Sequence, residues 1–177
     1  ASDDGSIYCL SHRGTLKWKE TLGNPQHSRP YLAVADLDGE GTLETIVCLP
    51  DGNVMVYTAF GDRAWVRSMG APVLGSPLIA DLNGDGWQDL LVATQNGQLV
   101  ALDTWGGTCW THYLGHTIES TPALTDLDRD GKYEIYVANL ISSHRKTGFL
   151  SQYEISVKGG KGLWLTVKGD PYRTGYA

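Results

Sequence analysis

The sequence lacks any apolar run of the roughly 20 residues that a membrane-spanning helix needs, and this excludes a transmembrane helix. It also lacks a basic cluster, because the longest cationic run is HRK at residues 144–146 and the formal net charge of the 177 residues is −6. Nucleic-acid binding requires a positive surface that displaces counterions from phosphates. The charge balance therefore argues against a nucleic-acid partner.

Cysteine is scarce. Cys9, Cys48 and Cys109 have no CxxC spacing, and each lies in an apolar, strand-like run. We interpret them as small buried core residues, which leaves the redox compartment open. The five histidines have no mutual spacing typical of a metal site.

Glycine and large aromatic residues are abundant, with 22 Gly, nine Tyr and six Trp, while 41% of the residues are hydrophobic and 19% charged. These proportions are typical of a folded globular chain. Many tight turns between strands rich in aromatic residues predict an all-β protein.

An acidic, glycine-containing stretch recurs three times with a period of 45 residues. DLDGEGTLE begins at Asp36, DLNGDGWQD at Asp81 and DLDRDGKYE at Asp126. The pairs Asp51-Gly52 and Asn96-Gly97 follow the first two copies and are typical of two-residue hairpin turns in which both central residues have positive φ. A constant period in this range indicates a repeat architecture.

A glycine four residues before a tryptophan recurs as well, and it predicts a turn followed by a strand with a large packing side chain. We expect these tryptophans to lie at equivalent places, partly covering the seams between sheets. The pairs are Gly14 and Trp18, Gly61 and Trp65, Gly106 and Trp110, and Gly160 and Trp164.

Each repeat therefore contains four short strands, which we call A to D, with the acidic loop between A and B. A four-stranded unit of this length is typical of one blade of a β-propeller. Helical solenoids are excluded because no segment keeps an apolar period of 3.6 residues. The predicted units are a half blade at 1–22, blades at 23–67, 68–112 and 113–166, and a C-terminal tail at 167–177.

Three and a half blades do not close a ring, since propellers typically have 4–8 blades. The half blade has strands C and D only, and the chain begins at Ala1 rather than Met, which is typical of a processed chain or a piece of a longer one. We expect the missing strands and blades to come from residues upstream of Ala1, with a second chain as the alternative. Expressed alone, the segment should be insoluble, oligomeric or bound to a partner, because its end faces and one strand edge are uncovered.

The acidic loops have the composition of a calcium site. Side chains at positions 1, 3, 5 and 9 carry oxygen, position 6 is glycine where the chain must turn sharply, and position 7 offers its carbonyl. Hard oxygen donors suit Ca²⁺, whereas zinc would require cysteine or histidine. Without an ion the carboxylates would repel one another.

We therefore predict three calcium sites. Position 12 is valine (Val47, Val92, Val137) where an EF-hand has its bidentate glutamate, so position 9 must supply the closing carboxylate. The predicted ligands are Asp36, Asp38, Glu40, Thr42 and Glu44 in the first loop, Asp81, Asn83, Asp85, Trp87 and Asp89 in the second, and Asp126, Asp128, Asp130, Lys132 and Glu134 in the third.

This pattern resembles the FG-GAP repeat family, the calcium-binding propeller blades of integrin α subunits and related surface proteins. The letters of the family name occur once, at Phe60-Gly61 and at residues 70–72, ahead of the loop that begins at Asp81; the other copies keep only the metal loop. The segments at 4–18 and 96–110 also resemble quinoprotein-type propeller repeats. The resemblance implies a propeller with structural calcium, usually extracellular, but no single function, because propellers host adhesion, lectin and enzyme activities alike.

Catalytic machinery is not evident in the sequence. There is no GxSxG, HExxH or phosphate-binding glycine loop, and we assign no catalytic residue. The acids that might form a glycosidase pair are assigned to calcium. Some pectin lyases use calcium-decorated propellers, so a polysaccharide-active enzyme remains an alternative. A quinoprotein dehydrogenase is disfavoured further, because it needs a complete ring around its cofactor and three and a half blades do not form one.

A candidate ligand face lies opposite the acidic loops, where the B–C turns and the links between blades meet. LISSHRKT replaces the short turn between Asn139 and Gly148 there. It is either an ordinary lengthened hairpin or a contact loop. The candidate contact residues are His144, Arg145 and Lys146, with His116 and Arg29 on neighbouring links.

The sequence thus favours a calcium-stabilised, non-catalytic binding or structural module of a secreted or cell-surface protein that recognises another protein or a glycan. One alternative is a catalytic or non-catalytic propeller portion of a polysaccharide-active enzyme. The other is a subunit-assembly module in which the incomplete ring is itself the interface.

Overall fold

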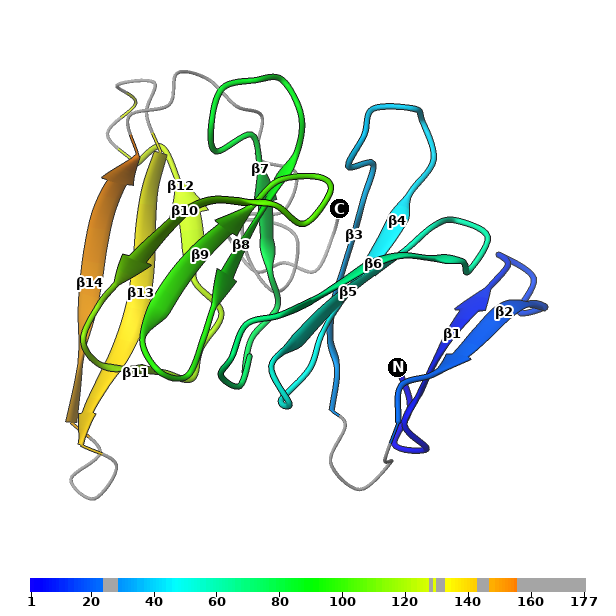
Figure 1. Ribbon diagram of the computed structural model, residues 1–177, viewed down its shortest axis with the longest axis horizontal. Coiled ribbons are helices and arrows are strands. Elements are labelled where there is room, and N and C mark those ends of the chain that lie inside the picture. Colours follow the sequence, from blue (N-terminus) through cyan, green and yellow to red (C-terminus); the bar gives the residue numbers. More distant parts are fainter. Residues whose placement is uncertain (24–28, 128, 130–132, 143–146, 156–177) are drawn as a thin grey trace.

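The computed structural model describes residues 1–23, 29–127, 129, 133–142 and 147–155 (Figure 1). Within these ranges the regular elements are β-strands, and no helix is long and apolar enough to cross a membrane. All strand pairs are antiparallel.

The strands form four sheets that stand side by side in chain order (Figure 1). The first is the hairpin of β1 (Ser6–Leu10) and β2 (Leu16–Thr21). The second is β3 (Tyr31–Ala35), β4 (Glu44–Cys48), β5 (Asn53–Tyr57) and β6 (Arg63–Ser68), and the third is β7 (Leu78–Ala80), β8 (Asp89–Ala93), β9 (Gln98–Leu102) and β10 (Thr108–Tyr113). In the last sheet one edge of β13 (Tyr133–Ser142) pairs with β11 (Thr117–Ile118) and β12 (Ala123–Thr125), and the other with β14 (Thr147–Ile155).

This arrangement is part of a β-propeller, as the sequence predicts. The sheets of 31–68 and 78–113 have four strands in consecutive order, so each is a complete blade. The hairpin β1–β2 supplies the equivalents of strands C and D alone. The first two acidic loops and the described C–D turns lie at the upper ends of the sheets in Figure 1, and the described B–C turns and the β6–β7 link lie at the lower ends.

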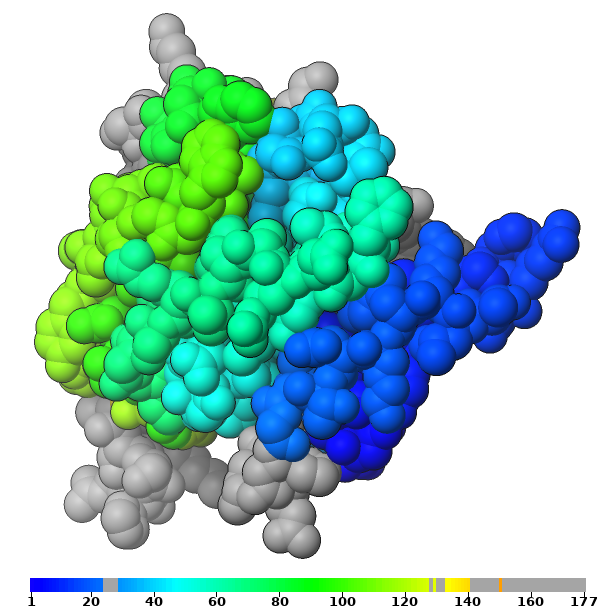
Figure 2. All heavy atoms as spheres, turned by 45° about the vertical axis from the view of Figure 1, so that its right-hand side comes forward, coloured from blue at the N-terminus to red at the C-terminus, as the bar shows by residue number. Residues whose placement is uncertain are grey.

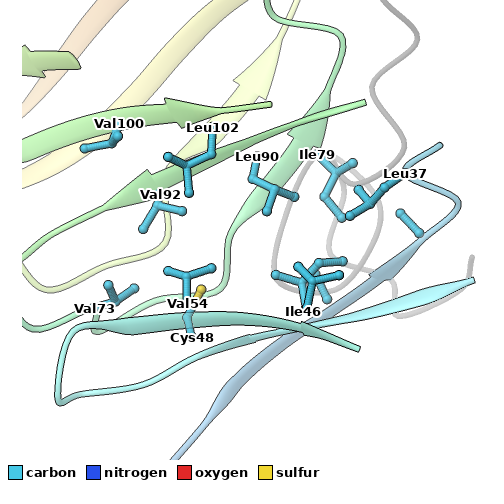
Figure 3. Packing of buried hydrophobic residues seen from close by; sticks show 13 residues of the cluster. Leu37, Ile46, Cys48, Val54, Val73, Ile79, Leu90, Val92, Val100 and Leu102 are labelled. Atoms are coloured by element: carbon cyan, nitrogen blue, oxygen red, sulfur yellow. The ribbon is translucent and has the colours of Figure 1, made fainter. Parts of the chain in front are cut away.

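The core lies in the seams between neighbouring sheets. Alternate residues of the inner strands face opposite seams, and on both faces most of them are buried and apolar, as in β4, β5, β8 and β9. Figure 3 shows the seam between the two complete blades, where Ile46, Cys48 and Val54 of one sheet face Leu90 and Val92 of the next, all fully buried. Burial of apolar area in these seams is the main stabilising contribution to the fold.

The hairpin turns lie where the sequence predicts them, but their type differs from the prediction. Gly52 N–H donates to Leu49 O over 2.9 Å. Gly52 has positive φ (+88°), whereas Asp51 does not. The turn at Asn96-Gly97 has the same form. These are three-residue turns that end in a left-handed glycine, and in each Asx-Gly pair only the glycine has positive φ.

Tryptophans cover the outer part of two seams. The Trp18 indole Nε1–H donates to Ala59 O over 3.1 Å, and Trp65 Nε1–H donates to Thr104 O over 2.9 Å, in both cases in the C–D turn of the next sheet. A Cβ on Gly61 would lie 2.7 Å from the Trp18 ring, so glycine is required there. Trp18 and Trp65 are thus equivalent, as expected. Trp110 is half-buried, and Trp164 lies outside the described residues.

The irregular segment after Asn139 continues as strand. β13 has 10 residues and β14 has 9, whereas their counterparts β4 and β5 have five each. The insertion therefore lengthens the hairpin. Its tip, with His144, Arg145 and Lys146, lies outside the described residues. Of the other candidate ligand residues, Arg29 lies exposed on the link before β3, and His116 lies exposed on the link before β11, with the β6–β7 link between these two.

Candidate metal centre

One hydrogen bond recurs in all three acidic loops and fixes the carboxylate at position 9. In each loop the backbone N–H at position 2 donates to one oxygen of that carboxylate. The N to O distances are 2.9 Å for Leu37 and Glu44, 2.8 Å for Leu82 and Asp89, and 2.7 Å for Leu127 and Glu134. The three acids are 7%, 0% and 2% exposed. A buried carboxylate is therefore held by one oxygen at the start of strand B, which leaves its second oxygen for the loop.

The aspartate at position 1 closes the loop in a similar way. Asp36 Oδ2 accepts from Gly41 N–H over 3.0 Å, and Asp81 Oδ2 accepts from Gly86 N–H over 3.0 Å. Both glycines have left-handed φ values, +89° and +91°, which aim the amide back at the first residue. The loop backbone is thus wrapped around its first carboxylate.

The first loop gathers three acids. Oxygen atoms of Asp36, Asp38 and Glu44 all lie within 4.8 Å of one another. Asp36 Oδ1 is buried and has no hydrogen-bond partner among the described residues. Burial raises the pKa of Glu44, and the neighbouring charges of Asp38 and Asp36 raise it further. Such a cluster is costly without a cation and forms hard-oxygen ligands with one.

Two other predicted ligands of the first loop, Glu40 and Thr42, are hydrogen-bonded to each other. Thr42 Oγ1 donates to Glu40 Oε1 over 2.8 Å, and both residues are more exposed than Glu44. The Glu40 carboxylate is therefore turned toward Thr42.

The second loop brings Asn83, Asp85 and Asp89 together. Asn83 Nδ2–H donates to Asp85 Oδ2 over 3.0 Å, and Asp89 Oδ1 lies 3.5 Å from the same nitrogen. Burial raises the pKa of Asp89 to about 6, with the charges of Asp85 and Asp81 adding to the effect. Without a cation, the amide hydrogens of Asn83 partly offset this negative charge. Trp87 N–H donates to Asp85 Oδ1 over 2.8 Å.

The third loop is described in part. Asp126 and Glu134 flank it, and Glu134 Oε1 is buried with no hydrogen-bond partner among the described residues. Asp128, Asp130 and Lys132 lie outside the described residues. The hydrogen bond between Leu127 and Glu134 matches the bonds at the same positions of the other two loops.

Cys109 lies beside the second loop, a position that the repeat alone did not reveal. Its Sγ lies 3.8 Å from Asn83 Nδ2 and 3.9 Å from Asp89 Oδ1. Burial and the charge of Asp89 raise the pKa of the thiol. The three cysteines are free; Cys48 is buried, as expected, whereas Cys9 and Cys109 are only half-buried. The sequence offered one indication of this position. Cys109 and Trp110 are consecutive in a strand, so their side chains must point to opposite faces of the sheet.

The donor set fits calcium. The side chains brought together in the first two loops are carboxylates and one carboxamide. Two buried carboxylate oxygens, Asp36 Oδ1 in the first loop and Glu134 Oε1 in the third, have no hydrogen-bond partner among the described residues. Buried acceptors without partners are rare in folded proteins, and a bound cation would satisfy these two. Zinc would require nitrogen or sulfur ligands, which Asp36, Asp38 and Glu44 do not offer.

Position 4 of the loop is left-handed in every copy. Gly39 and Gly84 have φ values of +70° and +81°, and Arg129 has +64°. Left-handed backbone costs a residue with a Cβ roughly 1–2 kcal/mol. We expect Arg129→Gly to stabilise the protein by up to about 1 kcal/mol, measured by urea unfolding in EDTA, because glycine removes this strain but loses more chain entropy.

Two variants test whether the backbone is the cause. Gly39→Ala should destabilise by about 1 kcal/mol, since a Cβ there would meet nothing within 4 Å and only the backbone conformation is strained. Arg129→Ala keeps the strain and removes the charge, so its stability should stay close to that of the parent. An equal gain from Arg129→Ala and Arg129→Gly would attribute the effect to charge instead.

Comparisons with known proteins agree with the repeat architecture described above. Residues 81–137, which span the second and third acidic loops, match the FG-GAP-like repeat family. The resemblance seen in the sequence is thereby confirmed for that segment. A comparison with curated proteins gives no match.

Solved structures share the fold. The V. cholerae biofilm matrix protein Bap1 is 23% identical with a TM-score of 0.63, over 90% of this chain and 24% of Bap1. BamB from Moraxella catarrhalis is 19% identical with a TM-score of 0.61, over 92% and 43%. BBS1N, solved in complex with ARL6DN, is 16% identical with a TM-score of 0.58, over 93% and 48%. These likenesses show the propeller fold, and the chain spans less than half the length of each of these proteins.

Proposed function

We propose that this chain is a calcium-stabilised β-propeller segment that serves as a structural and recognition module and has no catalytic role of its own. The observation that carries the proposal is the buried carboxylate at position 9, held in the same way in three loops by the N–H at position 2. An acidic turn that only faced solvent would not bury these acids.

The residues that would hold calcium are those of the three acidic loops. In the first loop they are Asp36, Asp38 and Glu44, whose oxygens already converge. In the second they are Asp81, Asn83, Asp85 and Asp89. Bound calcium would supply positive charge that neutralises these acids and joins strands A and B of each blade. This role is structural, because the ion would tie two neighbouring strands together.

Recognition is supported by exposed aromatic side chains near the acidic loops. Trp87, in the second loop, and Trp105, in the next C–D turn, contact each other with ring centroids 5.6 Å apart and are 40% and 64% exposed. Phe60, in the C–D turn of the preceding blade, is 80% exposed. Exposed tryptophans are enriched where proteins bind partners. The ligand we propose is a protein or a glycan, and BBS1N offers a structural relative that was solved with a protein partner.

The location that suits this role is the cell surface or the extracellular space. Extracellular calcium modules bind with dissociation constants of roughly 10⁻⁴–10⁻³ M, which requires a calcium concentration that the cytosol does not supply. The biofilm matrix protein among the similar structures is in keeping with such a location.

Calcium stoichiometry tests the proposal. Isothermal titration and elemental analysis of dialysed protein should give three calcium ions per chain, and Asp85→Ala should leave two. Asp62→Ala is the matched control, because Asp62 is an exposed acid in the β5–β6 turn outside the acidic loops, and it should keep three. Absence of bound calcium in both measurements would refute the proposal.

A further inference from the structure

The seam between the hairpin β1–β2 and the sheet β3–β6 is only partly covered. Val34, Ile79 and Leu124 stand at the same place in successive repeats, yet Val34 is 42% exposed while Ile79 and Leu124 are 0% and 1% exposed. The next position along the seam behaves alike: Thr45 is half-buried, and its counterpart Leu90 is 0% exposed. The equivalent surface is therefore covered in the two later sheets and open in the sheet β3–β6.

The complete seam shows what normally covers this surface. Ile79 packs in one cluster with Leu37 and Ile46 of the preceding sheet, and Figure 3 shows Leu37 directly beside Ile79. Leu37 is position 2 of an acidic loop, and Ile46 lies on β4. The cover thus comes from strands A and B and the loop between them. The sheet that precedes Val34 consists of β1 and β2, the equivalents of strands C and D.

A groove of about 470 Å³ lies at the open place. Its walls include Tyr8, Leu10 and Trp18 from the hairpin and Val34 and Leu43 from the next sheet. Leu10 and Leu43 are 57% and 55% exposed. In Figure 2 the hairpin, in blue, stands beside the sheet β3–β6 and projects beyond it.

The edge of β1 that would border the occupant is also open. Among the described strands β1 pairs with β2 alone, whereas its counterparts β5 and β9 each pair with a strand on both sides. An open edge offers a row of backbone donors and acceptors to a further strand.

The turn that leads into β1 gives the direction of that strand. Ser2 N–H donates to Ser6 O over 2.9 Å, Gly5 N–H donates to Ser2 O over 3.2 Å, and Gly5 has φ +77°. The B–C turn at Leu49–Asn53 has the same two bonds and a left-handed Gly52. Ser2 therefore stands where strand B ends, and a chain entering this turn runs antiparallel to β1.

We propose that the groove is the docking site of a strand–acidic loop–strand segment of the same repeat, whose second strand pairs with β1 and enters the turn at Ser2. In this register the second strand lies opposite Ile7–Leu10, as β4 lies opposite β5. The leucine at position 2 of its loop covers Val34. This inference concerns a separate surface and does not rest on the calcium proposal.

A graft tests the docking site directly. Residues 31–47 are copied in front of Ala1, so that Ala1 and Ser2 take the places of Cys48 and Leu49. We expect the graft to raise the midpoint of thermal unfolding by at least about 5 °C in EDTA. Hydrogen exchange at the β1 amides should slow at least about tenfold, since they become paired. The control graft is the same segment with Asp at the copied positions of Leu37 and Ile46.

Val34→Asp tests the predicted contact. In the ungrafted chain it should change the unfolding midpoint little, because Val34 is 42% exposed; in the grafted chain it should remove most of the gain. Val66→Asp on β6, where Val66 is 49% exposed, should behave alike in both chains.

Two outcomes would overturn the docking proposal. The first is a graft that is no more stable than the control graft, or whose β1 amides exchange as fast as before. The second is an ungrafted dimer in analytical ultracentrifugation that Val34→Asp dissociates, which would make a second copy the occupant.

Discussion

Removal of calcium is expected to lower the midpoint of thermal unfolding by about 5–10 °C for each saturated site. An ion that binds only the folded state stabilises it by about 2.7 kcal/mol when its concentration is a hundred times Kd. For a chain of this size, each kcal/mol shifts the midpoint by roughly 2–4 °C. The physical reason is the close approach of the acids, since oxygens of Asp36, Asp38 and Glu44 lie within 4.8 Å of one another. Scanning calorimetry in calcium and in EDTA measures the shift.

Magnesium is the control for this experiment. It demands near-octahedral geometry with short bonds and gives up its waters reluctantly, so it should restore little of the lost stability. An unfolding curve that is the same in EDTA and in calcium would contradict the prediction.

Asp89→Asn should have opposite effects with and without calcium. Burial raises the pKa of Asp89 to about 6, above its value in the unfolded chain, so at pH 7 ionised Asp89 disfavours the folded state of the calcium-free protein. Asparagine removes that charge and keeps an oxygen for Leu82 N–H. The variant should therefore melt at the same or a higher temperature in EDTA, and should gain less from calcium because one ligand charge is lost.

Asp62→Asn is the matched control, since Asp62 is exposed and outside the acidic loops, and it should match the parent in both buffers. A loss of stability by Asp89→Asn that is equal in EDTA and in calcium would show that Asp89 serves the fold and not an ion.

Trp65→Ala is expected to cost about 3 kcal/mol of unfolding free energy, at the lower end of the values for buried aromatic residues because Trp65 is half-buried. The ring packs against Gly106, where a Cβ would lie 3.0 Å from it, and its Nε1–H donates to Thr104 O. The substitution therefore opens the seam between the two complete blades. Urea unfolding of the variant measures the loss.

Two further variants separate packing from general surface effects. Trp65→Phe keeps a ring but loses the indole hydrogen bond, so we expect a loss of about 1 kcal/mol beyond its smaller volume. Trp105→Ala removes a side chain that is 64% exposed and should stay within about 0.5 kcal/mol of the parent. Near-neutral behaviour of Trp65→Ala would mean that the tryptophan is dispensable for the seam.

Local sequence was sufficient to predict the strands, the turn positions and the acidic loops. Strand and turn preferences act within a few residues, so the 45-residue recurrence of DLDGEGTLE revealed the blades. The same local reasoning predicted the wrong turn type at Asp51-Gly52. The pair is typical of a two-residue turn with two left-handed residues, but only Gly52 is left-handed. Turn type depends on how the flanking strands pair, and dipeptide preference leaves that open.

In the acidic loops, too, the sequence predicted the residue types and the folded chain determined their contacts. Their spacing alone selected Glu44 and Asp89 as metal ligands, because oxygen-bearing side chains recur at fixed positions. The folded chain adds a second role for these acids, since one oxygen of each accepts the N–H of position 2. That bond depends on the path of the loop backbone, which the residue types do not specify.

By itself the sequence determined the class of the fold and the positions of the acidic loops, because strand and turn preferences act within a few residues and the loop motif recurs every 45 residues. Only the tertiary structure decided which residues meet across the seams. Trp18 follows Gly14 by four residues, yet it packs against Gly61 of the next sheet. Val34 and Ile79 are equivalent apolar residues on equivalent strands, but one is 42% exposed and the other 0%. Burial is set by the neighbouring sheet, and a local sequence pattern does not say whether that neighbour is complete.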